Sequence, residues 1–119
     1  MKLPYRNNCF VPKEKLTEYL LSEVHKEGKS KANFFLLMGF SKRNVEFLES
    51  ELTNLAIENK VTKTKNTIFG MKYVILGMIK TPKGRSISIS TVWIVDKFKK
   101  RPRFVTAYPL KRKSYTGGV

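Results

Sequence analysis

The segment HKEGKSKANFF, residues 25–35, contains the side chains best suited to acid–base chemistry on an anion. His25 is the only histidine of the chain, and an imidazole with a pKa near neutrality can donate or accept a proton. Gly28 lets the backbone approach a ligand closely, and Lys29 and Lys31 follow it at the expected start of a helix. The segment predicts a site that holds one phosphate group. The alternative is an ordinary loop between two helices, with solvated lysines.

The tripeptide Gly-Lys-Ser at residues 28–30 also ends the phosphate-binding loop of nucleoside triphosphatases. That motif requires another glycine five residues before Gly28, where this sequence has Glu23, and it requires a strand before the loop. The sequence pattern predicts no strand there. We therefore exclude a nucleoside triphosphate site.

A second group of polar side chains lies near the end of the chain, in RFVTAYPL, residues 103–110. Strict alternation along this predicted strand places Phe104, Thr106 and Tyr108 on one face, with Val105 and Ala107 on the other. Hydroxyl groups of the preceding strand, from Ser88, Ser90 or Thr91, would join Thr106 and Tyr108 in one polar surface.

Arg85 and Arg103 flank these two strands and are suited to clamp a phosphate with paired N–H donors. The alternative is that the hydroxyl groups pair across the strands and the aromatic rings pack together, with no ligand. Trp93 is expected in the core, because Val92, Ile94 and Val95 surround it in the sequence.

Charge divides the chain into two unlike halves. Residues 1–59 carry nine Lys or Arg and eight Asp or Glu, whereas residues 60–119 carry fifteen Lys or Arg and one acid, Asp96. A half with a net charge of +14 attracts polyanions, and a merely solubilising surface is the alternative. We predict nucleic-acid contacts from Arg85, Lys97, Lys99, Lys100, Arg101, Arg103, Lys111, Arg112 and Lys113.

Three segments of the first half have helical periodicity. Residues 11–22 and 29–40 are predicted to form short helices, with Pro12 at the first helical position of the former and Gly39 ending the latter. Residues 41–60 form the clearest helix, capped by Ser41. Its apolar stripe consists of Val45, Leu48, Leu52, Leu55 and Ala56.

From Lys60 the periodicity changes to two. Residues 67–81 are apolar on both faces in the middle, as in a central strand, and residues 85–96 place Ile87 and Ile89 on one face. Pro82 and Gly84 mark the turn between them. We expect a single α+β domain over residues 1–110, with about three N-terminal helices packed on one face of an antiparallel sheet of about four strands. Residues 111–119 are expected to form a flexible basic tail.

Several classes of protein are excluded or disfavoured. One cysteine, Cys9, permits no intrachain disulfide bond and fits a reducing, cytoplasmic location. One histidine, one cysteine and one aspartate do not make a convincing ligand set, so we expect no metal ion and no cofactor. No apolar run approaches the length of a membrane span, and no exposed apolar helix suggests membrane-surface binding.

The order of three segments resembles a group of small bacterial domains. These segments are KLTEYLLSEVHKEGKSKANFFLLMGF, STVWIV and RFVTAYPL, and the resemblance extends from Lys15 to Pro109. Similar domains occur beside a small partner gene and at the ends of large secreted toxins, and they are similar to the barnase/EndoU/colicin/RelE-type ribonuclease superfamily. The resemblance implies helices against a four-stranded antiparallel sheet and an RNA-cleaving toxin neutralised by an acidic, antitoxin-like partner. The shared polar residues are His25, Gly28, Lys29, Lys31, Thr106 and Tyr108.

The first functional hypothesis is therefore a metal-independent endoribonuclease of the toxin type. In this hypothesis His25 transfers a proton, Lys29, Lys31 and Arg85 stabilise charge on the phosphate, and Thr106 and Tyr108 position it or donate a proton. The second hypothesis is a nucleic-acid-binding protein without catalysis that uses the same basic surface. A module that docks an acidic protein remains a third alternative.

Overall fold

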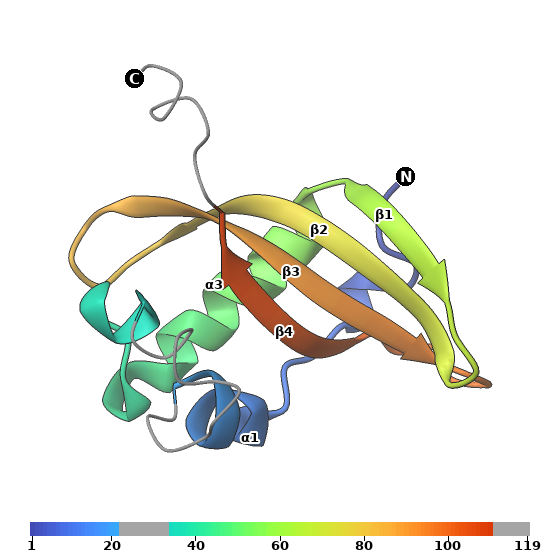
Figure 1. Ribbon diagram of the computed structural model, residues 1–119, viewed down its shortest axis with the longest axis horizontal. Coiled ribbons are helices and arrows are strands. Elements are labelled where there is room, and N and C mark those ends of the chain that lie inside the picture. Colours follow the sequence, from blue (N-terminus) through green and yellow to red (C-terminus); the bar gives the residue numbers. More distant parts are fainter. Residues whose placement is uncertain (22–33, 111–119) are drawn as a thin grey trace.

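A computed structural model describes residues 1–21 and 34–110, and Figure 1 shows the arrangement of its helices and strands. The sheet is antiparallel, has four strands, and follows the order β1-β2-β3-β4. Helices precede the strands, so the predicted α+β class is confirmed. The bounds are η1 Arg6–Asn8, α1 Lys13–Lys15, η2 Leu16–Leu20, η3 Lys42–Asn44, α3 Val45–Glu58, β1 Val61–Asn66, β2 Gly70–Lys80, β3 Ser86–Asp96 and β4 Arg103–Pro109.

The long helix forms where its periodicity and its cap predict it. The hydroxyl of Ser41 accepts a hydrogen bond from the Arg43 N–H at 3.2 Å, and the Asn44 side chain accepts one from the Ser41 N–H at 2.8 Å. This capping box begins the short turn η3, and α3 continues from it. The predicted stripe is buried along its whole length and consists of Val45, Leu48, Leu52, Leu55 and Ala56.

The first predicted helix is also present, with an irregular second half. Pro12 occupies the N-cap position rather than the first helical position, and α1 begins at Lys13. The chain then continues into the wider π-type turn η2, in which the Leu21 N–H donates to the Leu16 carbonyl at 2.8 Å. Leu16 and Leu20 are fully buried, which places this segment against the core. Of the second predicted helix, the described part contains the helical residues 34–37.

The helix α3 packs on one face of the sheet, which we call the inner face, and Figure 1 shows it behind the strands. Gly77 permits the close approach, because a Cβ there would lie 2.8 Å from the Leu55 side chain and 2.9 Å from that of Asn59. Tyr73, Ile75, Ile79, Ile89, Trp93, Phe104 and Ala107 are buried in the core beneath the helices. The predicted core position of Trp93 is therefore confirmed.

Two strand predictions need correction. The polar segment VTKTKN forms the edge strand β1, which pairs with β2 and which the sequence analysis did not assign. The next strand begins at Gly70 rather than at residue 67, since Thr67 to Phe69 form the β1–β2 turn. A central strand that is apolar on both faces was expected to be buried on both. Leu76 and Met78 are instead 37% and 57% exposed, so one face of the middle of β2 is open.

The N-terminal segment crosses from one edge of the sheet to the other. Lys2 forms an antiparallel bridge with Lys60 before β1, and Phe10 forms a parallel bridge with Arg103 at the start of β4. The backbone hydrogen bonds of Phe10, to Pro102 and from Phe104, are both 3.0 Å long. The short turn η1 lies between these two attachments, and it is thereby held at the end of the sheet where β4 begins.

Candidate functional site

The outer face of the sheet, opposite α3, carries the side chains that alternate with the core residues of β2 and β3. Leu76 and Met78 are exposed on this face, so the described helices leave it open there. Ile94 lies on the same face and is only 4% exposed, although it does not belong to the main core cluster. The outer face therefore has a small apolar centre, and polar and basic side chains surround it.

A β-bulge in β4 changes which of its side chains share a face. Trp93 pairs with Phe104, whereas the preceding residue Val92 pairs with Thr106, so β4 has one extra residue at this point. Phe104 is consequently in the core, while Thr106 and Tyr108 lie on the outer face. The prediction that Phe104 shares a face with these two residues was wrong, because strict alternation does not survive an inserted residue.

The hydroxyl groups of the outer face come from β3 and β4. Tyr108 pairs with Ser90 and is 44% exposed, whereas Thr106 is only 7% exposed. Thr91 does not belong to this group. It is fully buried, donates to the Ile75 carbonyl at 2.8 Å and accepts from the Trp93 indole N–H at 2.9 Å. The outer-face hydroxyl groups of β3 and β4 are those of Ser86, Ser88, Ser90, Thr106 and Tyr108.

A groove of about 340 Å³ lies next to these hydroxyl-bearing residues, at the β2–β3 turn. Arg85 and Ser88 line one side of it, and Phe34, Met38 and Leu110 contribute apolar surface. Leu110 is held there because its N–H donates to the Ser88 carbonyl at 3.1 Å. The groove is therefore lined by an arginine and two serines beside apolar residues, near the end of the strand that carries Tyr108, and arginine is a side chain that binds phosphate well.

Three further lysines lie on the outer face at the other edge of the sheet, and we call them the edge lysines: Lys63, Lys65 and Lys72. Lys65 and Lys72 pair directly across β1 and β2, and Lys63 pairs with Val74. Like charges directly opposite each other destabilise a sheet. Lys63 and Lys65 were not predicted because β1 was not assigned, although Thr62, Lys63, Thr64 and Lys65 alternate with period two. Lys72 lies in the strand predicted over residues 67–81, but its place on an open face could not be recognised without β1.

The predicted basic loop between β3 and β4 contains cations in two different situations. Arg103 donates two hydrogen bonds to Asp96, at 3.1 and 3.2 Å, and this pair joins the two strands. The Arg101 guanidinium lies 4.0 Å from the centre of the Phe10 ring and donates to the Asn8 carbonyl at 3.0 Å. These two arginines therefore hold structure together. The other cations of the turn, Lys97, Lys99 and Lys100, are exposed and form no ion pair among the described residues.

The predicted nucleic-acid contacts do not form one continuous patch. Arg85 precedes β3 and Lys97 follows it, and the eleven residues of this strand separate them. At about 3.3 Å per residue, the two ends lie roughly 35 Å apart. In Figure 1 the β2–β3 turn is at one end of the sheet, and the β1–β2 and β3–β4 turns are at the other. A ligand that contacts both ends must be long.

Residues 2–111 match the sequence pattern of a family described as a domain of unknown function, DUF6883. The chain belongs to this family. The match covers all the strands and helices described above. No curated protein matches the sequence.

This DUF6883 domain shares its fold with a chain of a contact-dependent growth inhibition toxin–immunity protein complex from Klebsiella pneumoniae 342. The two chains superpose with a TM-score of 0.70 at 16% sequence identity, over 91% of this chain and 98% of that chain. At this level of identity the likeness extends to the fold and not to individual site residues.

Part of the predicted site lies outside the described residues of this DUF6883 member. This applies to the proposed acid–base residue His25 and the proposed phosphate ligands Lys29 and Lys31, and equally to the tail residues Lys111, Arg112 and Lys113. Ser88 and Tyr108 lie on the outer face, whereas Arg85 pairs with Thr81 at the β2–β3 turn and lines the groove at the same end of the sheet. Convergence of His25 with Thr106 and Tyr108 stays a prediction.

The described residues offer little other chemistry. Within residues 1–21 and 34–110 no cluster of three or more His, Cys, Asp or Glu side chains is placed to hold a metal ion. No helix in these two ranges is long and apolar enough to cross a membrane. Burial raises the pKa of the Cys9 thiol, which keeps it protonated at neutral pH and therefore a poor nucleophile.

Proposed function

We propose that this chain is a toxin-like endoribonuclease that holds RNA on the outer face of its sheet and cleaves it without a metal ion. One observation carries the proposal: the cations of the sheet are not balanced within the protein. Asp96 is the only acid after residue 59, and it is occupied by Arg103. Among the described residues no carboxylate forms an ion pair with the edge lysines or with Arg85, and a phosphodiester backbone supplies negative charge to such cations at regular intervals.

The proposed reaction is attack by a ribose 2′-oxygen on the adjacent phosphorus. His25 takes the proton of the 2′-hydroxyl while Tyr108 gives one to the departing 5′-oxygen, or His25 gives that proton while water takes the one from the 2′-hydroxyl; the products are a 2′,3′-cyclic phosphate and a free 5′-hydroxyl. Lys29, Lys31 and Arg85 stabilise the charge that builds up on the phosphate oxygens. Tyr108, which lies at the same end of the outer face as the Arg85 groove, hydrogen-bonds the phosphate or supplies the second proton.

The shared fold supports the toxin-like part of the proposal, because the neighbour belongs to a toxin–immunity protein complex. We extend this to an acidic, antitoxin-like partner that covers the same basic face and blocks access of RNA. Complementary charge would speed the association of such a partner. Action on RNA places the protein in the cytoplasm.

One observation favours the second candidate, a nucleic-acid-binding protein without catalysis. Thr106 is only 7% exposed, and a side chain so buried has little surface to offer a substrate. In this alternative the edge lysines and the exposed lysines of the β3–β4 turn hold the nucleic acid, and binding depends steeply on salt.

The decisive experiment incubates the purified protein with total RNA and with DNA in EDTA, and gel electrophoresis detects fragments. RNA fragments ending in a cyclic phosphate are expected from the wild type, and His25→Ala is expected to bind RNA without cutting it. Arg85→Ala and Tyr108→Phe are expected to slow cleavage by about 100- to 1000-fold, since general acid–base and charge-stabilising groups contribute factors of this size.

The matched control is Lys42→Ala, which removes an exposed cation from η3 outside the sheet. It is expected to cleave as the wild type does. A wild-type protein that retards RNA in a salt-sensitive manner and produces no fragments would favour the second candidate. Full cleavage by His25→Ala would remove the histidine from the mechanism.

A further inference from the structure

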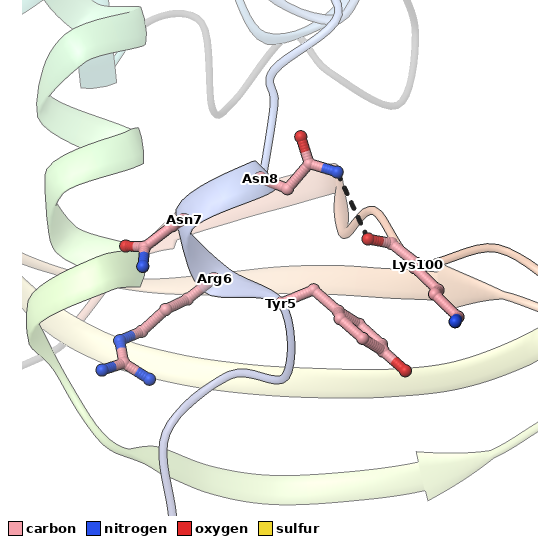
Figure 2. A pocket seen from close by; sticks show the side chains of 5 residues that line it. All are labelled: Tyr5, Arg6, Asn7, Asn8 and Lys100. Carbon is pink, nitrogen blue, oxygen red and sulfur yellow. Dashed lines mark hydrogen bonds between the residues drawn. The ribbon is translucent and has the colours of Figure 1, made fainter.

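A hollow of about 420 Å³ lies at the opposite end of β3 from the Arg85 groove, between η1 and the β3–β4 turn. Its lining residues are Tyr5, Arg6, Asn7, Asn8 and Lys100. Figure 2 shows the Tyr5 ring and the Lys100 side chain extending in the same direction, with Arg6 on the other side of Tyr5. An aromatic ring therefore stands between two cations.

The positive charge of this hollow is not neutralised by any carboxylate within residues 1–21 and 34–110. No acidic residue lines it, and within the described ranges neither Arg6 nor Lys100 forms an ion pair with a carboxylate. The neighbouring arginines differ in this respect, because Arg103 is paired with Asp96 and Arg101 is stacked on Phe10. Arg6 and Lys100 thus remain available to an anionic ligand.

The backbone of Tyr5 is in a conformation that suits tyrosine badly. Its φ angle is +56°, in the left-handed region that glycine and asparagine occupy at lower cost, and its side chain is 51% exposed. Phe98, in the adjacent β3–β4 turn, has a φ angle of +64° and is fully exposed. Core packing explains neither ring, since both lie largely in solvent. Unfavourable backbone geometry of this kind concentrates at ligand-binding positions.

The two segments that form the hollow are fixed to each other. The Asn8 side-chain amide donates to the Lys100 carbonyl at 3.3 Å, and the dashed line in Figure 2 marks this hydrogen bond. Arg101 donates in the opposite direction, to the Asn8 carbonyl, at 3.0 Å. A ligand therefore meets a hollow that already exists, and little ordering of the chain opposes binding.

We propose that this hollow binds one nucleotide of a single-stranded RNA, with the base stacked on Tyr5 and the flanking phosphates on Lys100 and Arg6. The inference rests on the proposed function for the identity of the polyanion. Stacking of bases on exposed aromatic rings, combined with cations that follow the backbone, is the usual mode of binding single strands. An acidic protein is the less suitable occupant, because the exposed rings here alternate with cations instead of forming a continuous apolar surface.

The position of the hollow adds a consequence for the substrate. It lies about one strand length, roughly 35 Å, from the Arg85 groove, because the two flank opposite ends of β3. An extended single strand covers this distance with several nucleotides between the two sites. The hollow would hold RNA away from the point of cleavage, so it would affect affinity and not the chemical step.

The test measures fluorescence anisotropy of a labelled 2′-O-methyl RNA of about 8 nucleotides, a length within the usual range of single-strand sites. Its methylated 2′-oxygen prevents cleavage, so binding is measured alone. Tyr5→Asn removes the ring and keeps a residue that tolerates the positive φ angle, and it is expected to weaken binding about 5- to 150-fold. Tyr5→Phe retains the ring and is expected to bind within about twofold of the wild type.

The phosphate contact has a test of its own. Lys100→Ala is expected to lower the slope of log affinity against log salt by about 0.7, the value for one phosphate contact on a single strand. Lys42→Ala is the matched control and should leave the slope unchanged. Equal affinity of Tyr5→Asn and the wild type would overturn the subsite, even if the wild type cleaves RNA.

Two other results would overturn more than the subsite. A wild type that neither binds the oligonucleotide nor cleaves RNA would refute the proposed function together with the inference. If the wild type binds poly-glutamate more tightly than RNA, and Tyr5→Asn loses the binding of poly-glutamate, the hollow belongs to an acidic protein instead.

Discussion

Replacing Lys72 by glutamate should affect stability and RNA binding in opposite directions. In the native protein Lys72 pairs with Lys65 across β2 and β1, so two lysine side chains leave directly opposed positions on the outer face. Lys72→Glu converts this repulsion into an attraction. Pairs of opposite charge across strands contribute about 0.2–1 kcal/mol, and directly opposed like charges cost free energy, so the variant should gain about 0.5–1 kcal/mol.

The expected change in melting temperature follows from the size of the chain. Unfolding entropy is about 2.1 cal/mol/K per residue, so for a chain of 119 residues a gain of 0.5–1 kcal/mol corresponds to about 2–4 °C. RNA binding should weaken at the same time. The substitution removes one cation and engages the other in an ion pair, so about two phosphate contacts are lost and the salt slope falls by about 1.4.

Calorimetry gives the melting temperature, and anisotropy with a labelled RNA at several salt concentrations gives the slope. The control is Lys42→Glu, which changes the net charge by the same amount outside the sheet. If Lys72→Glu binds RNA no more weakly than Lys42→Glu does, the edge lysines do not contact RNA. A lower melting temperature in Lys72→Glu would show that the assigned pairing does not repel.

Three further predictions concern an ion pair, a partly buried thiol and a close contact between helix and sheet. Asp96→Asn leaves Arg103 without its carboxylate, so urea unfolding should show a loss of about 0.5–1 kcal/mol while RNA affinity rises. Because burial raises the pKa of Cys9, iodoacetamide should modify it more slowly at pH 8 than it modifies free cysteine, and the rate should rise as the pH approaches that raised pKa. Gly77→Ala should cost about 1–3 kcal/mol in unfolding free energy, since its methyl group would meet the Leu55 side chain on α3.

The elements that the sequence predicts well are those whose signals are local. The helix α3 has a cap at Ser41 and an apolar stripe of period 3.6, and both depend only on neighbours within the helix. The strand β3 alternates cleanly, so Ile89 was correctly placed on the buried side. Such features survive folding because tertiary contacts reinforce the local preference.

The features that the sequence did not predict depend on the pairing partner. Five of the six residues of β1 are exposed and none is apolar after Val61, so nothing in its composition resembles a buried strand, and pairing with β2 alone defines it. The bulge in β4 follows from its register against Val92 and Trp93, and it moves Thr106 to the face opposite Phe104. The hollow beside Tyr5 needs two segments separated by more than ninety residues, joined through Asn8 and Arg101.

Net charge alone treats the cations of the second half as equivalent, and their pairing shows that they are not. Arg101 and Arg103 are the residues that a search for phosphate ligands would choose first, because a guanidinium binds a phosphate through two hydrogen bonds. Both are instead engaged with the protein itself, on Phe10 and on Asp96. The lysines at positions 65, 72 and 100 lack such partners among the described residues, and two of them face each other at a cost to the sheet. The β3–β4 turn therefore engages its two arginines with the protein and leaves its lysines exposed, which is the arrangement that the proposed binding of a polyanion requires.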